Sequence, residues 1–77
     1  MKIINCNTLG KSIRTRRKEL GYTQTDIAEA TGLSASFISN VETGKETAEI
    51  GKILFLINTL GMDMSVEIRG SKASRQR

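Results

Sequence analysis

The sequence predicts an all-α, compact four-helix domain with one C-terminal β-strand. Residues 23–45 contain two short helical patterns hinged at Gly32, and residues 9–20 and 48–60 carry apolar residues at helical spacing. After Gly61 the apolar period falls from about 3.6 to about 2 residues, as in a half-buried strand. A chain of 77 residues supports one domain with a marginal core, which favours dimerisation.

The first helix is expected over Leu9 to Leu20, capped by Asn7 or Thr8 and stopped by Gly21. Its buried stripe should combine three apolar side chains with the stem of one arginine: Leu9, Ile13, Leu20 and Arg17. Such a helix is too short to be stable alone, so the other elements must cover that stripe.

The second helix is expected over residues 24–31. Thr23 is its N-cap, and Asp26 stands three positions on, which is close to a capping box. Gly32 then supplies a backbone conformation that side chains resist. Ala28 allows the next helix to cross closely.

The third helix should run from Ala35 to about Thr43, with Ser34 as N-cap and Gly44 as terminator. Branched apolar residues fill the angle between the second and third helices: Ile27, Leu33, Ile38 and Val41. Their spacing predicts a helix-turn-helix unit.

The fourth helix is expected over Ala48 to about Leu60, capped by Thr47. Its apolar stripe is broad and comprises Ile50, Ile53, Leu54, Phe55, Leu56, Ile57 and Leu60. Part of this stripe, Phe55 included, would meet a second subunit, or the helix would be wedged among the others. Gly51 inside the helix costs about 1 kcal/mol relative to alanine, which indicates a close backbone approach.

A strand is expected over residues 62–69. Its apolar positions are Met62, Met64, Val66 and Ile68, and they alternate with Asp63, Ser65, Glu67 and Arg69. A lone strand leaves its main-chain groups unpaired. Its partner would be the same strand of a second copy or the short extended segment Lys2–Asn5. The domain would thus span residues 1–69, followed by a disordered basic tail at 70–77.

The charge pattern is compatible with a polyanionic partner. Twelve Lys and Arg against eight Asp and Glu give +4, and three of these net charges lie in residues 70–77. A second basic cluster falls on the first helix and contains Lys11, Arg14, Arg16, Arg17 and Lys18. The cluster suits a helix lying along a phosphate backbone, although a solvated basic face is the alternative.

Several classes of protein are disfavoured. Cys6 is the only cysteine and cannot form an internal disulfide, so it is interpreted as a small apolar residue, with redox sensing as the alternative. The absence of histidine disfavours a zinc site and general base catalysis, and we expect neither a cofactor nor enzymatic activity. Without a signal peptide or membrane-spanning stretch, the expected location is cytoplasmic, and nucleoid-associated when bound to DNA.

Residues 9–60 strongly resemble the Cro and phage-repressor (XRE) type of helix-turn-helix domain. The resemblance rests on Arg-Lys-Glu-Leu-Gly-Tyr-Thr-Gln-Thr-Asp-Ile-Ala, Gly-Leu-Ser and Ile-Ser-Asn-Val-Glu-Thr-Gly-Lys, and implies a lambda-repressor-like fold. The end of the domain, Phe-Leu-Ile-Asn-Thr-Leu-Gly-Met-Asp-Met-Ser-Val-Glu-Ile, resembles HipB-like antitoxins. That resemblance implies strands paired between protomers, a palindromic operator and a HipA-like kinase toxin.

Base reading is expected from short polar side chains near the start of the third helix: Ser34, Ala35, Ser36, Ser39 and Asn40. Of these, only Asn40 can make a two-point contact with adenine, and a solvated helix face is its alternative. Ser34 is also an N-cap, and Phe37 would either pack at the domain edge or touch thymine methyls or sugars.

Phosphate contacts are expected from Gln24, Arg17, Lys45, Lys11 and Arg14. The resemblance implies that Gln24 binds a phosphate and braces the third helix. It also implies a structural ion pair between Arg17 and Glu42, joining the first helix to the end of the third. Surface solvation is the alternative for Lys45, Lys11 and Arg14.

The favoured function is a dimeric operator-binding repressor that is also the antitoxin of a type II toxin-antitoxin pair. Its partners would be double-stranded DNA, a second copy of the chain and a HipA-like kinase toxin. The alternatives are a stand-alone or phage-type regulator without a toxin, and an adaptor that uses the same fold only for protein contacts. The dimer contact is expected from Met62, Met64, Val66, Ile68 and Phe55.

Overall fold

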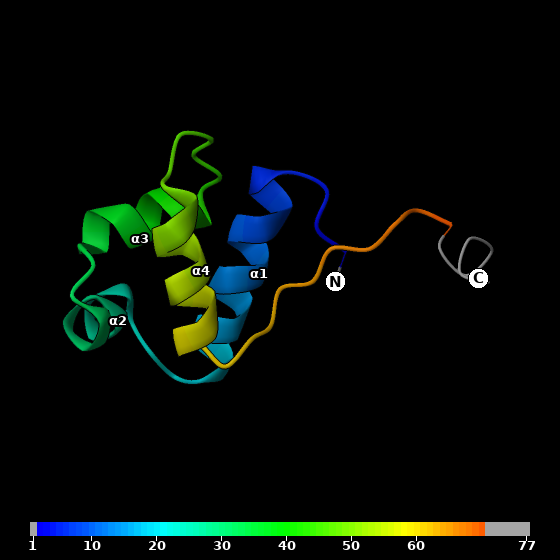
Figure 1. Cartoon of the computed structure of the whole chain (residues 1–77). Coiled ribbons are helices and arrows are strands. Elements are labelled where there is room, and N and C mark those ends of the chain that lie inside the picture. The colour runs from blue at the N-terminus through cyan, green and yellow to red at the C-terminus, as the bar shows by residue number, and fades with distance from the viewer. Residues whose placement is uncertain (1, 71–77) are drawn as a thin grey trace.

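The computed structural model describes residues 2–70 and contains four α-helices in that part of the chain (Figure 1). They are α1 (Cys6–Glu19), α2 (Gln24–Thr31), α3 (Ala35–Glu42) and α4 (Ile50–Thr59). In Figure 1, α2 and α3 occupy one end of the molecule, while the N-terminal segment and the chain after α4 lie at the other. None of the helices among residues 2–70 is long and apolar enough to cross a membrane.

The start of α1 differs from the prediction. The helix begins at Cys6, three residues early, and its N-cap is Asn5, not Asn7 or Thr8. The Asn5 side chain accepts from the Thr8 backbone N–H at 2.9 Å, and the Thr8 hydroxyl accepts from the Asn5 backbone N–H at 3.1 Å. This reciprocal capping box satisfies two N–H groups that a later start would leave unpaired. The predicted burial of Leu20 is also wrong, because Leu20 is the C-cap and is exposed.

The predicted bounds and cap of α2 are confirmed. Thr23 and Asp26 form a complete capping box, with backbone-to-side-chain distances of 2.8 and 3.0 Å. Gly32 closes the helix with φ of 80°, in the left-handed region that glycine adopts at low cost. Thr23 and Gly32 therefore determine where the hinge before α3 begins.

The third helix starts as predicted. The Ser34 hydroxyl accepts from the Phe37 backbone N–H at 3.0 Å, so Ser34 is the N-cap. The helix ends at Glu42, with Thr43 as C-cap and Gly44 beyond it at φ of 90°. Ile38, Val41 and Glu42 face inward.

The start of α4 is later than predicted. Thr47 lies in a turn, and the helix begins at Ile50 with Glu49 as an N-cap that makes no side-chain capping bond. At the other end, Nε of Arg16 donates to the Leu60 carbonyl at 2.9 Å and satisfies one of the free carbonyls of the last turn. Gly61, with φ of 73°, ends the helix as expected.

A single apolar core joins the four helices. Its buried members are Ile13, Ile27, Ile38, Val41, Ile53, Leu56, Ile57 and Leu60. Half-buried side chains pack around it, among them Leu9, Leu33, Phe37 and Met62. The broad stripe of α4 divides into this buried side and three exposed side chains, those of Ile50, Leu54 and Phe55.

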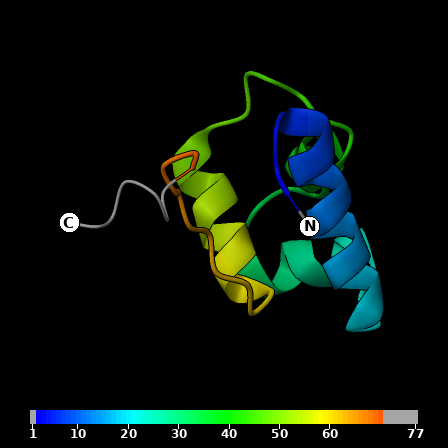
Figure 2. The ribbon, with the colours of Figure 1, turned by 90° about the vertical axis from the view of Figure 1, so that its right-hand side faces the viewer.

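Residues 62–68 adopt neither helix nor strand, and no strand is present among residues 2–70. The chain leaves the end of α4 and reaches the side of the molecule where the N-terminal segment lies (Figure 1), and in the view of Figure 2 it passes in front of α4, apart from α1. A strand requires a hydrogen-bonded neighbour, so the predicted pairing of this segment remains a proposal. Most of the predicted disordered tail, residues 71–77, lies outside the described residues.

Candidate nucleic-acid interface

The outward face of α3 consists of small side chains, all of them polar except that of Ala35. Ser34, Ala35 and Ser36 are exposed at the start of the helix, and Ser39 and Asn40 are half-buried further along. The Ser34 hydroxyl accepts the capping bond described above, which orients it toward the backbone of α3. A face of this kind lets a helix approach base edges closely, because no bulky side chain separates them.

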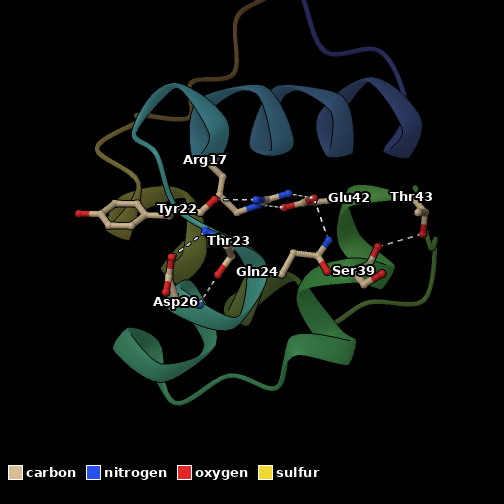
Figure 3. A network of polar contacts seen from close by, with 8 residues as sticks. All are labelled: Arg17, Tyr22, Thr23, Gln24, Asp26, Ser39, Glu42 and Thr43. Carbon is tan, nitrogen blue, oxygen red and sulfur yellow. Dashed lines mark hydrogen bonds and ion pairs between the residues drawn. The ribbon is translucent and has the colours of Figure 1, made fainter.

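The inward side of the same helix ends in a buried ion pair (Figure 3). Arg17 of α1 reaches Glu42 of α3 with Nε at 2.7 Å from Oε2 and Nη2 at 3.0 Å from Oε1. The amide of Gln24, at the start of α2, donates to Oε1 at 3.0 Å. Nη1 of Arg17 donates to the Tyr22 carbonyl at 2.7 Å. Three helices thus meet at one carboxylate, and Arg17 joins the loop before α2 to the same junction.

The protonation states at this junction reinforce the pairing. Burial alone would raise the pKa of Glu42, but hydrogen bonds from Arg17 and Gln24 and the positive charges of Arg17 and Arg14 outweigh it and lower the pKa. The hydrogen bond with Glu42 raises the pKa of Arg17 despite its desolvation. The only acidic residue of α3 is therefore charged, buried and neutralised by a partner, so it does not repel a phosphate backbone.

A close backbone contact also sets the position of α3. Gly10 of α1 is buried against the last turn of α3, next to the carbonyl groups of Val41 and Glu42. A methyl carbon at Gly10 would lie 2.6 Å from the Glu42 carbonyl oxygen and 2.8 Å from its carbonyl carbon. Only glycine permits this approach without displacement of one helix. Gly10 is thus a positioning residue for the α3 face.

The predicted phosphate contacts divide into two groups. Lys11, Arg14 and Lys45 are exposed and remain available to an external anion. Gln24 is half-buried, and its amide is bonded to Glu42. Arg17 is 6% exposed, and each of its three guanidinium nitrogens donates to an acceptor within the protein. This geometry argues against a phosphate contact by Arg17.

Phe37 packs at the edge of the core. Its ring is half-buried against the core cluster, and Nζ of Lys52 on α4 lies 5.9 Å from the ring centroid. That distance allows a cation–π interaction, worth about 0.5–1 kcal/mol at an exposed site. The geometry favours the domain-edge interpretation of Phe37.

Sequence reasoning missed three residues of this region: Gly10, Arg16 and Asn5. For Gly10 a signal was present, because a glycine within a helical pattern costs about 1 kcal/mol and often marks a packing contact. Asn5 and Thr8 have the spacing of a capping box, which also could have been recognised. No sequence signal distinguishes Arg16 from the other basic residues of α1, because its acceptor lies 44 residues away.

Comparison with known proteins places this geometry in a family. The helix-turn-helix family model matches residues 13–66. An uncharacterised HTH-type transcriptional regulator, y4mF of Sinorhizobium fredii, is 36% identical over 64 residues, covering 83% of this chain and 84% of the relative. The ImmF control region 10 kDa protein of Bacillus phage phi105 is 36% identical over 61 residues, covering 75% of this chain and 64% of the phage protein.

Solved structures agree on the fold. A HipB–O4 20mer complex and a HipA–HipB–O2–O3 complex each contain a chain with a TM-score of 0.80 and 22% identity to this protein. In both, the match covers 88% of this chain and 96% of the other. The geometry of the α3 face agrees with the family match. The chain therefore belongs to the XRE-type helix-turn-helix family of DNA-binding transcriptional regulators, as the family match and the curated relatives show.

Proposed function

We propose that this protein is a dimeric, sequence-specific repressor that binds a near-palindromic operator and acts as the HipB-like antitoxin of a type II toxin-antitoxin system. The observation that carries the DNA-binding part is the α3 face, with small polar side chains outward and its one carboxylate, Glu42, buried against Arg17. Ser36, Ser39 and Asn40 are the proposed base-reading residues, with Ala35 available to a thymine methyl. Ser34 is proposed to act at the groove edge while it caps α3.

Lys45, Lys11, Arg14 and Gln24 are the proposed phosphate contacts. Lys45 follows the left-handed turn at Gly44, and Gln24 begins α2, where the helix N-terminus favours an anion. Such contacts position α3 without reading sequence.

Dimerisation is supported by apolar surface that residues 2–70 leave exposed. Val66 is 95% exposed and Ile68 72% exposed, and Met64 and Phe55 are also exposed. These residues are the proposed subunit contact, with Met62 at the inner end of the segment. In Figure 1 the chain after α4 runs to the opposite side of the molecule from α2 and α3, so a second copy that pairs with this segment would leave α3 free. Two α3 helices would then reach half-sites about one helical turn, or about 34 Å, apart.

The toxin partner is proposed from the resemblance of residues 55–68 to HipB-like antitoxins. The solved structures of similar fold include HipB with operator-length DNA and HipB with HipA and DNA. By analogy, the partner would be a HipA-like kinase toxin.

A phage-type or stand-alone regulator is the alternative. The 36% identity to the ImmF control region protein of phage phi105 favours it, because that relative is closer in sequence than the HipB chains. Both candidates read DNA through α3, and they differ in whether a second protein is bound.

The DNA part is tested by selection of bound sequences from a random duplex library with the full chain. A near-palindrome with half-sites about one turn apart is expected.

A matched pair of variants then tests the dimer. Val66→Ser with Ile68→Ser removes exposed apolar groups without disturbing the core, and should yield a monomer with weaker operator binding. Deletion of residues 70–77 should leave the dimer intact. An unchanged dimer in the double variant would refute this subunit contact.

The antitoxin part is tested by purification at native expression level from the host, followed by identification of bound protein. A kinase-sized protein that co-purifies in a fixed ratio, and is toxic when expressed alone, supports the proposal. Operator binding with no such partner would favour the phage-type alternative.

A further inference from the structure

The segment that follows α4 has apolar side chains at alternate positions, and the two nearest the domain, Met62 and Met64, are the best covered. Met62 is half-buried against the core, Met64 is 42% exposed and Val66 is 95% exposed. Ile68, at 72%, is also largely uncovered. The described residues therefore cover the beginning of the segment and leave its middle and far end available to a partner.

The alternation of side chains restricts how two copies of this segment can pair. Side chains directly opposite each other in a β-ladder lie on the same face. Met62, Met64, Val66 and Ile68 have even numbers, so even positions must oppose even positions to keep one apolar face. In a symmetric antiparallel pair, the two-fold axis must then pass through a residue and not between two residues. A one-residue slip would turn one set of apolar side chains to the other face.

The charged positions select one of these registers. With the axis at Ser65, Asp63 would face Glu67 of the partner subunit twice, and with the axis at Glu67 the two Glu67 carboxylates would face each other. With the axis at Val66, Asp63 faces Arg69 of the partner subunit twice, and no like charges are opposed. An in-register parallel pair would oppose every charge with its own copy.

Registers centred nearer the ends are too short. An axis at Met64 leaves only residues 62–66 to pair before the chain enters the turn at Gly61. An axis at Ile68 would pair Glu67 with Arg69 of the partner subunit, but it leaves Met62 and Met64 without apolar partners. The Val66 register pairs Met64 with Ile68 of the partner subunit and uses residues 63–69, which end with Arg69 at the start of the turn at Gly70.

A groove beside the segment fits the same arrangement. It has a volume of about 610 Å³ and is lined in part by Ile3, Leu9, Ile57, Met62 and Met64. In the Val66 register, Ile68 of the partner subunit lies opposite Met64 and diagonal to Met62, both of which line the groove. The uncovered end of one segment would thus pack at the groove of the other copy. The occupant of this surface is a second copy of the chain.

We propose that two copies pair residues 63–69 as an antiparallel ladder whose two-fold axis passes through Val66, with Asp63 of each copy facing Arg69 of the other. The inference rests on the proposed dimer and adds its register. In this register the charges of Asp63 and Arg69 determine how the two copies align. Apolar contacts alone would not require these two charges.

Disulfide trapping tests the register in the full chain with Cys6→Ala as background. Opposed Cα atoms lie about 4.5–5.5 Å apart, within disulfide range, whereas copies of a residue next to the axis are separated by roughly 8 Å. Val66→Cys should therefore cross-link at least tenfold faster than Ser65→Cys or Glu67→Cys. If the Ser65→Cys or Glu67→Cys variant cross-links fastest and still dimerises, the proposed register is refuted but the dimer is not. If sedimentation shows that the unmodified chain is a monomer, the register and the dimer are both refuted.

Charge exchange supplies an independent readout. Asp63→Arg or Arg69→Asp alone turns two attractions into two repulsions and should weaken the dimer roughly tenfold at low salt. The double variant should restore wild-type affinity, and mixing the two single variants should yield heterodimers, because both contacts are then attractive. An extended strand separates residues 63 and 69 of one chain by roughly 20 Å, so rescue cannot arise within a subunit. Failure of both rescues would refute the pairing.

Discussion

Arg17 and Glu42 form a bidentate ion pair that is almost wholly withdrawn from solvent, with side-chain exposures of 8% and 2%. The pair joins α1 to the last turn of α3, and Gln24 extends the junction to α2. Within the described residues, no buried side-chain nitrogen or oxygen is left without a hydrogen-bond partner. The orientation of the α3 face therefore depends on a junction in which every buried side-chain nitrogen and oxygen is hydrogen-bonded.

Removing one partner of this ion pair should lower the free energy of unfolding more than replacing both partners by apolar residues. Glu42→Gln leaves Arg17 as a buried charge without a counterion and should lower the free energy of unfolding by about 3–5 kcal/mol. Arg17→Met combined with Glu42→Leu should cost clearly less than either single change, because no charge is left unpaired. Urea unfolding followed by circular dichroism gives the comparison. Additive costs for the two changes would contradict this account.

The folded state should lose stability in acid. The pKa of Glu42 lies below its ordinary value of 4.5 in the folded protein, so the unfolded chain binds more protons between the two values. The contribution is complete above about pH 4.5 and is lost as the pH falls through the folded pKa. Asp26, whose pKa the hydrogen bonds from Thr23 lower, acts with the same sign. Melting temperatures between pH 3 and pH 7 should show this loss, and the Arg17→Met/Glu42→Leu variant should show a shallower one.

Two helical glycines should respond in opposite ways to alanine. Gly10→Ala inserts a methyl carbon against the Val41 and Glu42 carbonyls, so it should destabilise the domain by about 1–3 kcal/mol and weaken operator binding. The close backbone approach expected at Gly51 is absent, because a methyl carbon there meets nothing within 4 Å. Gly51 has an ordinary helical backbone, so Gly51→Ala should stabilise the domain by up to about 1 kcal/mol. Thermal unfolding of both variants measures the difference. Tolerance of alanine at position 10 would show that α1 and α3 can separate freely.

Replacement of Asn40 should reveal base reading. If its amide contacts an adenine, Asn40→Ala should cost roughly 1–3 kcal/mol on the selected operator and relax preference at one position per half-site. Affinity measured against a set of single-base operator variants gives both quantities. Equal affinity and unchanged base preference would remove Asn40 from the reading face.

Replacement of Lys45 should affect all DNA alike. A phosphate contact carries no sequence information, so Lys45→Ala should weaken operator and random duplex by the same factor. It should also reduce the slope of log affinity against log salt by about one unit per contact in each subunit. Lys52→Ala is a suitable control, since Lys52 lies near Glu49 and Phe37. A loss confined to the operator would contradict the phosphate assignment.

The sequence by itself determined the local elements where a short-range signal was sufficient. Thr23 with Asp26, Ser34, and the glycines at 32, 44 and 61 act through neighbours within a few residues, and the structure has α2 and α3 beginning at the predicted residues. Apolar spacing likewise identified the core, because side chains three or four residues apart in a helix share a face. The family resemblance, rather than any local rule, indicated the Arg17–Glu42 pair.

Only the tertiary structure decided which contacts are made by residues that look alike in the sequence. Arg16 and Arg17 are adjacent in a basic cluster, yet Arg16 caps α4 and Arg17 is buried on Glu42, because each depends on an acceptor distant in sequence. The role of Gly10 follows from the path of α3, and the exposed part of α4 follows from how the other helices cover it. Such assignments depend on packing between elements, which no local pattern encodes.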